Sequence, residues 1–369
     1  MTLSLDEVKS RLAVFAEREA HGVSPLYEHL ATEAAQDDEV AGLLVAAAPD
    51  DARPTLLLAA AHRLIAADPI HPLSRYYPSL GGFDGADGDT WPLFREFLLD
   101  RADRARELIA SRYTQTNEVR RAALLYPGVS LAAKEAKGKI ALLEVGCSAG
   151  LLLGIDRFSY RYQCDGGEQL SAGPAKAAVG LHCPMGLEPG AVAPKLPKKL
   201  NVGAKIGLDR NPIDAGDEEE LAWLEACVWA DQPDRIRLLR AAAADQRKAP
   251  PELVTGDAVD DLASTAARLP GDLPLVVMTS HTLAYLSDDR RAEFVDRLTA
   301  LSADRPLWWV TIGSYAAGLR YVLPDRTDLA TPDGEQIGLL GVIRFDGGTH
   351  RATPLARTAP HGQRMTWLA

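Results

Sequence analysis

The densest group of residues suited to chemistry is the segment Glu144-Val-Gly-Cys-Ser-Ala-Gly150. It follows an apolar run, Ile140–Leu143, which is typical of a buried β-strand, and it precedes Leu151–Phe158, which can form a helix of about two turns. Small residues at this point allow a sharp turn whose backbone approaches a ligand closely. We expect the N-terminus of the following helix to present its N–H groups to that ligand.

The glycine spacing indicates which ligand this turn suits. The motif is acid-x-Gly-x-small-x-Gly rather than Gly-x-Gly-x-x-Gly, so it disfavours a dinucleotide-dependent oxidoreductase. The carboxyl ends of parallel strands meet at one edge of a sheet, where ligands bind. Three later apolar runs also end in polar residues, at Asp209, Asp257 and Ser280-His281. These ends are therefore expected beside the glycine-rich turn.

This order of features resembles the class I S-adenosylmethionine-dependent methyltransferases, with Ser148 where those enzymes often have a second glycine. The resemblance implies that Asp209 binds the ribose hydroxyls, that Asp257 faces the adenine amino group, and that the end of the fourth strand borders the transferred methyl group. The cofactor is then S-adenosyl-L-methionine. The expected cofactor contacts are Glu144, Gly146, Cys147, Ser148, Ala149, Gly150, Asp209, Arg210, Asp257, Ala258 and Ser280.

One departure from that family lies between Gly150 and Asp209, which are much further apart than usual. We interpret residues 159–203 as an inserted hairpin and loop near the cofactor edge. This insertion would carry specificity or form an oligomer contact, for example in a homodimer. It also leaves Asp156 and Asp165 as alternatives to Asp209 at the ribose. Capping or turn formation is the alternative role for Asp209 and Asp257, because Asp is favoured at such positions.

Two residues near the end of the fourth strand are candidates for catalysis. Methyl transfer mainly needs alignment of acceptor and methyl group, and an oxygen or nitrogen acceptor also benefits from a general base. His281 is expected to be that base or to orient the acceptor, because histidine ordinarily titrates near neutral pH. Tyr285, about one helical turn later, is the second candidate. A structural histidine bonded to the backbone is the alternative for His281.

The residues expected at the substrate lie before the glycine-rich segment. A helix over Asn117–Leu125, ending near Pro127-Gly128, would place Asn117, Glu118 and Arg121 together as a lid. The alternative is a surface salt bridge between Glu118 and Arg121, which contributes little stability. Tyr77, in a proline-rich loop, is expected to line the acceptor pocket or to anchor the core.

The hydrophobic patterns predict two domains. Residues 1–135 are expected to form an all-helical N-terminal cap domain; Leu5, Val8, Leu12 and Phe15 show the spacing of one helix face. Residues 136–369 alternate short apolar runs with helical stretches, which favours an α/β, class I methyltransferase-like (Rossmann-like) doubly wound sheet. Its last strands, Gly338–Phe345 and Thr349–Ala356, flank an Asp-Gly-Gly turn and are expected to pair antiparallel.

Bulk properties restrict the partners. The 369-residue chain has a formal net charge of −11, which disfavours nucleic acid and anionic lipid as partners. The start of the chain lacks a basic region followed by an apolar run, and no apolar stretch is long enough for a membrane span. We therefore expect a cytoplasmic protein with free thiols. No metal is expected, because no Cys-x-x-Cys pair or His/Cys/Asp cluster has ligand spacing.

A second resemblance spans nearly the whole chain. Four segments are together similar to an uncharacterised bacterial family, namely Gln115–Arg121, Gly207–Asp214, Val228–Pro233 and Pro360–Gly362. The function hypothesis is an S-adenosylmethionine-dependent methyltransferase acting on a small-molecule acceptor. The alternatives are an enzyme that uses S-adenosylmethionine for cyclisation, elimination or transfer of another group, and a non-catalytic nucleotide-sensing or interaction module.

Overall fold

A computed structural model describes residues 3–331 and 337–369. Contacts within the chain define two compact units, a helical unit of Met1–Thr116 with Gly216–Arg237, and a sheet unit of Asn117–Ala215 with Leu238–Ala369. This division differs from the expected boundary at residue 135, because α7 (Arg121–Ala136) packs on the sheet. The division also assigns Gly216–Arg237 to the helical unit, and the boundary after Arg237 falls within α9 (Pro233–Gln246).

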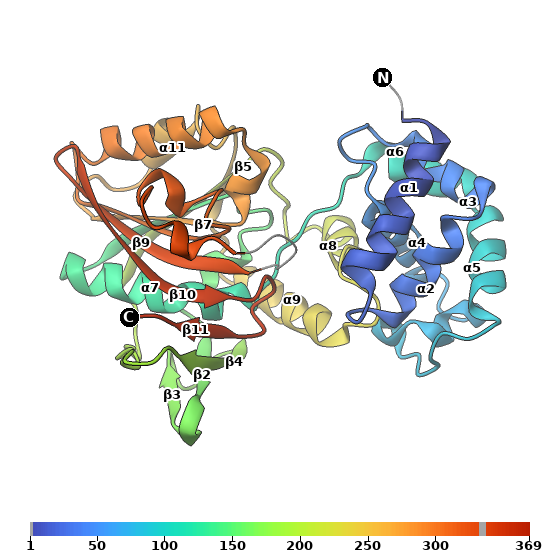
Figure 1. The fold of residues 1–369 in the computed structure, drawn as a ribbon, viewed down its shortest axis with the longest axis horizontal. Helices are drawn as coiled ribbons and strands as arrows, with labels where there is room; N and C mark the ends of the chain where they lie inside the picture. The colour runs from blue at the N-terminus through green and yellow to red at the C-terminus, as the bar shows by residue number, and fades with distance from the viewer. Residues whose placement is uncertain (1–2, 332–336) are drawn as a thin grey trace. The chain divides into compact units, whose positions relative to one another are not determined.

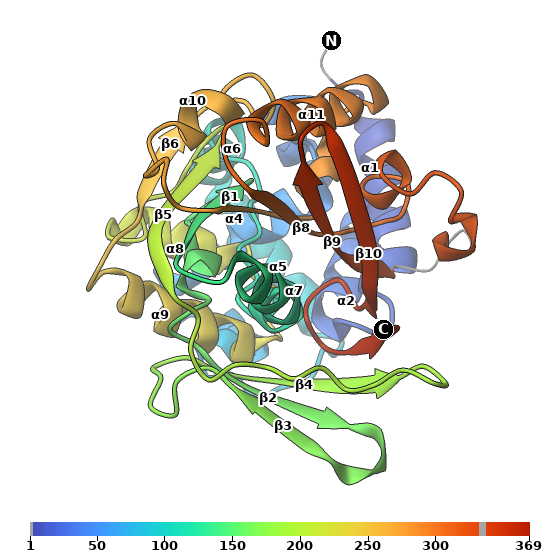
Figure 2. The ribbon, with the colours of Figure 1, turned by 90° about the vertical axis from the view of Figure 1, so that its left-hand side faces the viewer.

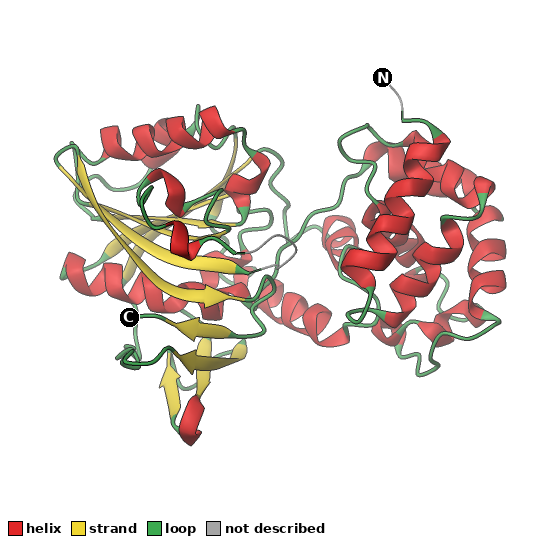
Figure 3. Ribbon diagram, viewed as in Figure 1, coloured by secondary structure: helices red, strands yellow, loops and turns green. Residues whose placement is uncertain are grey.

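The helical unit is a group of packed helices (Figures 1 and 3), and their buried apolar side chains form a hydrophobic core. Its α-helices are α1 (Leu5–Phe15), α2 (Pro25–Ala34), α3 (Asp38–Leu43), α4 (Pro54–Ala66), α5 (Thr90–Leu99), α6 (Ala102–Ser111) and α8 (Glu218–Ala226). Ser4 and Glu7 form a capping box at the start of α1, whose buried residues are Val8, Leu12 and Phe15. Most of α4 is buried on every side, as expected for a helix that is apolar all round. Tyr77 lies fully buried in this core.

Among the described residues, eleven strands form one sheet, in the order β3-β2-β4-β11-β10-β9-β8-β7-β1-β5-β6. The strands are β1 (Ile140–Val145), β2 (Ser159–Cys164), β3 (Gln169–Ala172), β4 (Gly180–Leu187), β5 (Val202–Asp209), β6 (Glu252–Thr255), β7 (Leu275–Ser280), β8 (Leu307–Gly313), β9 (Gly338–Asp346), β10 (Thr349–Thr358) and β11 (Met365–Trp367). Strands β6, β5, β1, β7 and β8 are parallel to one another, and β9 pairs antiparallel with both β8 and β10.

Helices cover both faces of the parallel strands. On one face, Val310, Val342 and Leu340 approach Gly128 of α7. On the other face, core residues such as Leu143 and Trp309 pack with α10 (Leu262–Ala266) and α11 (Asp288–Leu301). Figure 2 shows α7 on the side of the sheet opposite α10 and α11. Covering on both faces explains why these strands are continuous apolar runs in the sequence. No helix in the described ranges is both long and apolar enough to cross a membrane.

The helix expected to end near Pro127-Gly128 instead runs through both residues to Ala136. Proline removes the N–H that would bond to the carbonyl four residues earlier, that of Ala123. The hydroxyl of Tyr162, from β2, donates to this carbonyl at 2.8 Å. Gly128 is needed because a Cβ there would lie 2.8 Å from Val310 Cγ1. Tertiary contacts therefore explain why neither residue breaks the helix.

The inserted segment forms strands of the same sheet. Strands β2 and β3 form the expected antiparallel hairpin, and β4 pairs in parallel with both β2 and β11. We expected this insertion near the cofactor edge. In the order of strands it instead extends the end of the sheet opposite to β5 and β6. Cys164 and Cys183 lie in neighbouring strands as free thiols.

We predict that Tyr162→Phe lowers the free energy of unfolding by about 1–3 kcal/mol, because the buried Ala123 carbonyl then has no donor. Chemical denaturation of the variant and of the wild type measures this difference. Ser171→Ala, which removes a hydroxyl from an exposed residue of the same unit, is the control and should stay within about 0.5 kcal/mol of wild type. Equal stabilities of Tyr162→Phe and the control would show that the hydroxyl does not support the helix.

Candidate functional site

The carboxyl ends of the parallel strands, together with the start of β9 and the end of β10, lie on one edge of the sheet. After β1 the chain forms β2, β3 and β4 at the far end of the sheet, adds β5 and β6 on one side of β1, and then returns to β7 on the other side of β1. Ligands of open α/β sheets bind outside the strand ends at such a reversal of strand order. Glu144, Asp209, Asp257 and Ser280 all lie at or close to this edge.

The glycine-rich turn has an unusual backbone conformation. Gly146, Ser148 and Gly150 have φ values of 74°, 51° and 66°. These lie in the left-handed region, which residues other than glycine rarely adopt. A Cβ on Gly146 would overlap the side chain of Thr282. After Gly150 only a single 3-10 turn forms, Leu151–Gly154, instead of the expected helix of two turns. The expected helix N-terminus facing the ligand is therefore not present.

Hydrogen bonds from distant parts of the chain hold this turn. Asn117 Nδ2 donates to the Cys147 carbonyl at 3.0 Å, and Gln246 Nε2 donates to the Ala149 carbonyl at 2.8 Å. The N–H of Ile213 donates to the Ser148 carbonyl at 3.1 Å. Three consecutive carbonyls are thus bonded, which fixes the turn in one conformation. Asn117 and Glu118 precede α7 rather than lying on it, so the expected shared helix face does not form.

Asp209, at the end of β5, lies directly against the turn. Its Oδ2 accepts a hydrogen bond from the Ser148 N–H at 2.7 Å, and its Oδ1 accepts one from the Asn211 N–H at 2.9 Å. The alternative acids have other partners. Asp156 forms an ion pair with Lys205, and Asp165 accepts from the Leu187 N–H at 3.3 Å within the insertion. Of the three acids, Asp209 is therefore the one bonded to the glycine-rich turn.

Asp257, at the tip of β6, shapes its own turn. Its Oδ1 accepts from the Val259 N–H at 2.9 Å and from Arg290 at 2.5 Å. Burial alone would raise the pKa of Asp257, but the backbone hydrogen bonds and the Arg290 guanidinium outweigh burial and lower it. Arg210 is mostly exposed, 4.0 Å from Asp257 Oδ2. The capping role considered for this acid is therefore present.

Several buried polar atoms at this edge have no hydrogen-bond partner within the described chain. They are Asn117 Oδ1, Glu144 Oε2, Ser280 Oγ, His281 Nε2 and Thr358 Oγ1. They come from four separate segments: the stretch before α7, and the ends of β1, β7 and β10. Buried polar groups are almost always paired, and each unpaired group costs about 1–3 kcal/mol. A concentration of them is explained by a ligand or water that completes their hydrogen bonds.

Two of these groups have strongly shifted pKa values. Burial, and then the nearby Asp209 charge, raises the pKa of Glu144 well above its ordinary range. Burial, and then the Arg121 guanidinium, lowers the pKa of His281 to about 3. His281 is therefore a neutral imidazole at neutral pH, and its ordinary pKa, on which the general-base expectation depends, does not apply. His281 also has a left-handed φ of 61°.

The remaining predicted site residues fall in different places. The Cys147 side chain packs against Gly207 of β5, where its Sγ lies only 2.6 Å from the position of a Cβ on that glycine. Cys147 therefore faces the turn with its backbone. Tyr285 is 72% exposed. Arg121 Nε donates to the Pro360 carbonyl at 2.9 Å, beside the C-terminal loop. Tyr77 cannot line a pocket as expected, because its whole side chain is enclosed in the core of the helical unit.

Three residues at this edge were not expected from the sequence. Gln246 fixes the turn, Thr282 Oγ1 donates to the Val145 carbonyl at 2.9 Å, and Thr358 has an unpartnered hydroxyl. The antiparallel pairing of β9 and β10 offers one usable signal. A strand that returns from a hairpin ends at the edge where the hairpin began, so Thr358 ends beside Gly338.

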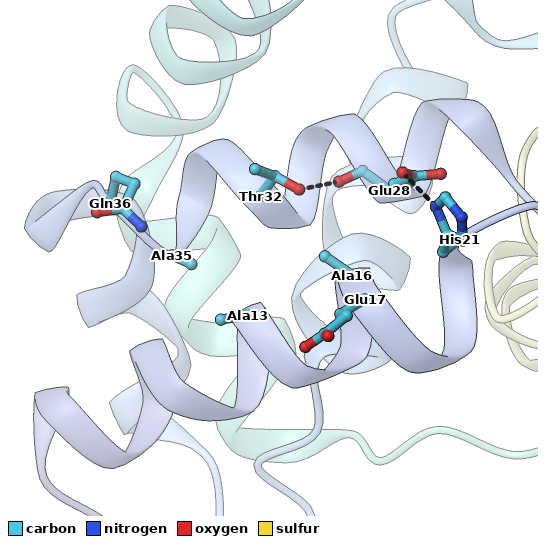
Figure 4. Close-up of a pocket in the computed structure, with 8 residues that line it drawn as sticks. All are labelled: Ala13, Ala16, Glu17, His21, Glu28, Thr32, Ala35 and Gln36. Atoms are coloured by element: carbon cyan, nitrogen blue, oxygen red, sulfur yellow. Dashed lines mark hydrogen bonds and ion pairs between the residues drawn. The ribbon is translucent and has the colours of Figure 1, made fainter. Parts of the chain in front are cut away.

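A surface groove of about 580 Å³ lies elsewhere, in the helical unit. Figure 4 shows it between α2 and the π-helical continuation of α1. Its lining residues are Ala13, Ala16, Glu17, His21, Glu28, Thr32, Ala35 and Gln36. It contains none of the predicted site residues. No group of three or more His, Cys, Asp or Glu side chains suited to a metal ion occurs in residues 3–331 and 337–369.

We predict that Glu144→Gln changes how stability depends on pH. A carboxyl group with a raised pKa binds its proton more tightly in the folded state, so its contribution to stability falls as pH rises from the ordinary carboxyl range. The amide cannot ionise, so the variant should gain stability relative to wild type as pH increases. Thermal unfolding across pH measures this, with the exposed Glu188→Gln as control. Parallel pH profiles for Glu144→Gln and wild type would contradict the buried, unpaired carboxyl.

Comparisons with known proteins identify a family rather than an activity. No curated protein matches the chain. One solved structure that resembles it is the sugar N-methyltransferase KedS8 from Streptoalloteichus sp ATCC 53650, with 10% identity, covering 66% of this chain and 77% of that chain. Its TM-score is 0.25, which is too low to support an argument. The family described as "Uncharacterized protein conserved in bacteria (DUF2332)" matches residues 9–367, so the chain belongs to that family.

Proposed function

We propose that the protein is an S-adenosylmethionine-dependent methyltransferase that acts on a small-molecule acceptor rather than on nucleic acid. One observation carries this proposal. Buried polar atoms without partners gather at the edge where the strand order reverses, beside a left-handed turn held by Asp209. The net charge of −11 adds that a nucleic acid is a poor partner.

The charges near the turn favour a cationic cofactor over a pyrophosphate. Pyrophosphates bind at helix N-termini, where N–H groups and the helix dipole attract anions. Only a single 3-10 turn follows Gly150, and the Asp209 carboxylate bonds directly to the turn. When bound, S-adenosylmethionine would supply an electrophilic methyl group on a positively charged sulfur. The Asp209 carboxylate would stabilise such a charge.

Asp209 is suited to hold the ribose of that cofactor. Each carboxylate oxygen already accepts one backbone N–H, and each retains a second lone pair. Two neighbouring ribose hydroxyls can therefore donate to one carboxylate whose position the backbone fixes. The raised pKa of Glu144 favours its protonated form, which can donate a hydrogen bond. Asn117 keeps the turn in place, because its amide N–H bonds the Cys147 carbonyl.

The acceptor is proposed to lie beside His281, at the end of β7 next to β1. Its neutral imidazole is a weak base, with a pKa of about 3, so it orients an acceptor hydrogen rather than storing a proton. Holding the acceptor in line with the methyl group is the larger part of the rate enhancement expected for such a displacement. Tyr285, on the exposed turn that follows, is proposed as a second contact.

We predict that the purified protein binds S-adenosylmethionine and S-adenosylhomocysteine, and that Asp209→Asn weakens both by about ten- to a hundredfold. This corresponds to the loss of charged hydrogen bonds to the ribose. Isothermal titration calorimetry measures the dissociation constants. Asp165→Asn is the matched control, because Asp165 lies in the insertion, and it should bind like wild type.

No binding of either ligand would overturn the proposed cofactor. Equal loss of affinity in Asp165→Asn and Asp209→Asn would overturn the ribose assignment. Product analysis separates the reactions that use the same cofactor: S-adenosylhomocysteine as the product supports methyl transfer, and methylthioadenosine supports the transfer or cyclisation of another group.

A further inference from the structure

Two of the residues with unpartnered groups, His281 and Thr358, lie beside Gly338, the first residue of β9. A Cβ built on Gly338 would lie 2.8 Å from Thr358 Oγ1, 3.4 Å from Ile312 Cγ2 and 3.6 Å from His281 Cε1. Thr358 is the register partner of Gly338 in β10. Three strand ends, those of β7, β9 and β10, therefore meet at one point, on the side of β7 away from β1 and β5.

Glycine at position 338 is required by close packing rather than by backbone conformation. Gly338 is not among the glycines with positive φ, so its conformation is one that any residue adopts. Gly146 differs, because its position requires both the left-handed conformation and the absence of a Cβ. A side chain at position 338 would crowd the Thr358 hydroxyl and approach the His281 ring.

The two polar groups beside Gly338, on Thr358 and His281, are both buried and both lack a hydrogen-bond partner. Thr358 is only 2% exposed, and its Oγ1 has no hydrogen-bond partner. His281 Nε2 is likewise buried without a partner. Both groups are uncharged, since the imidazole is neutral at neutral pH. A hydroxyl can donate and accept, and a neutral imidazole nitrogen does one or the other.

We propose that His281 and Thr358, beside Gly338, form the acceptor subsite, and that this subsite takes an uncharged hydroxyl or amine group. The proposal depends on the proposed function for the methyl donor, whereas the subsite is defined by the protein's own atoms. The acceptor would donate its hydrogen to His281 Nε2, and Thr358 Oγ1 would donate to an acceptor oxygen or accept a second hydrogen from an amine.

An uncharged acceptor suits the surrounding charges. The Arg121 guanidinium is close enough to act on His281, so it would repel an ammonium group held there. Arg121 would attract a carboxylate, but the imidazole and the hydroxyl offer it only one hydrogen each, too few to replace its hydration in a buried site. A hydroxyl or a neutral amine needs no more partners than His281 and Thr358 provide.

The transfer balances without a further reactant. The acceptor lone pair forms a new O–C or N–C bond to the methyl carbon as the C–S bond breaks. The electron pair of the C–S bond stays on sulfur, which becomes a neutral thioether. The acceptor hydrogen that pointed to His281 Nε2 leaves as a proton to water, so the positive charge lost by the sulfonium is released as that proton.

The test is an NMR titration of protein labelled with 15N-histidine, without any methyl donor, with the His281 signal assigned by its loss in His281→Asn. Four probes of similar size are added at neutral pH: 1-propanol, methoxyamine, which is an uncharged amine, propylammonium and propionate. We expect saturable shifts of the His281 ring nitrogens with the two neutral probes and none with the two charged ones at equal concentration. The relative affinities of 1-propanol and methoxyamine then distinguish a hydroxyl from an amine acceptor.

Two variants and one control complete the test. Gly338→Ala and Thr358→Val should each weaken the neutral probes about tenfold or more. Gly271→Ala, in a loop with open space around the new methyl group, should bind like wild type. Thr358→Val should keep or raise the melting temperature, because it removes a buried hydroxyl without a partner. A fall in its melting temperature would show instead that Thr358 has a structural role.

Several results would overturn the subsite. They are no saturable shift with either neutral probe, equal shifts with the charged probes, or unchanged affinity in Gly338→Ala. Since no methyl donor is present, this outcome is independent of calorimetry with S-adenosylmethionine. Failure of calorimetry alone would remove the donor and leave the subsite, and failure of the titration alone would remove the subsite and leave the donor.

Discussion

Three backbone carbonyls in succession, those of Cys147, Ser148 and Ala149, each accept a hydrogen bond from a different part of the sheet unit. With the Asp209 carboxylate bound to the Ser148 N–H, they hold the turn after β1 in one left-handed path. A non-glycine residue in that region costs on the order of 1 kcal/mol. The ordered network offsets this cost, and it places the strand ends around one fixed point.

The same edge combines several features that lower stability. It has left-handed residues at Ser148 and His281, and buried polar atoms on β1, β7 and β10 that find no partner in the described chain. The sheet behind it has an apolar core, with helices on both faces. Proteins keep strained and unsatisfied groups where function requires them. This contrast between a stable sheet and a costly edge is the basis of the proposed site.

The central strands could be predicted from sequence because their signal is local. A strand covered on both faces must be a continuous apolar run, so the run Ile140–Leu143 predicts a strand, which the structure extends to Val145. The course of α7 could not be predicted from sequence. Pro127 is tolerated because the hydroxyl of Tyr162, which is remote in sequence, bonds the Ala123 carbonyl. The single turn after Gly150 was also missed. Leu151–Phe158 has a helical composition, but the chain leaves the turn for β2 at Ser159.

The candidate site divides in the same way. Glu144 and Asp209 follow from a strand followed by a turn, a pattern visible in sequence. Thr358 and Gly338 do not, because their proximity depends on the register of β9 and β10. The neutral state of His281 also required the structure, since burial rather than residue type sets its pKa. Tyr77 shows the converse, because a loop tyrosine proved to be fully enclosed in another core.

A crystal structure of the protein with S-adenosylhomocysteine tests the central claim most directly. We expect the ligand at the carboxyl edge, with both ribose hydroxyls on Asp209 and its sulfur facing the His281 side. A ligand bound elsewhere, or an edge whose unpartnered groups contact only one another, would contradict the account.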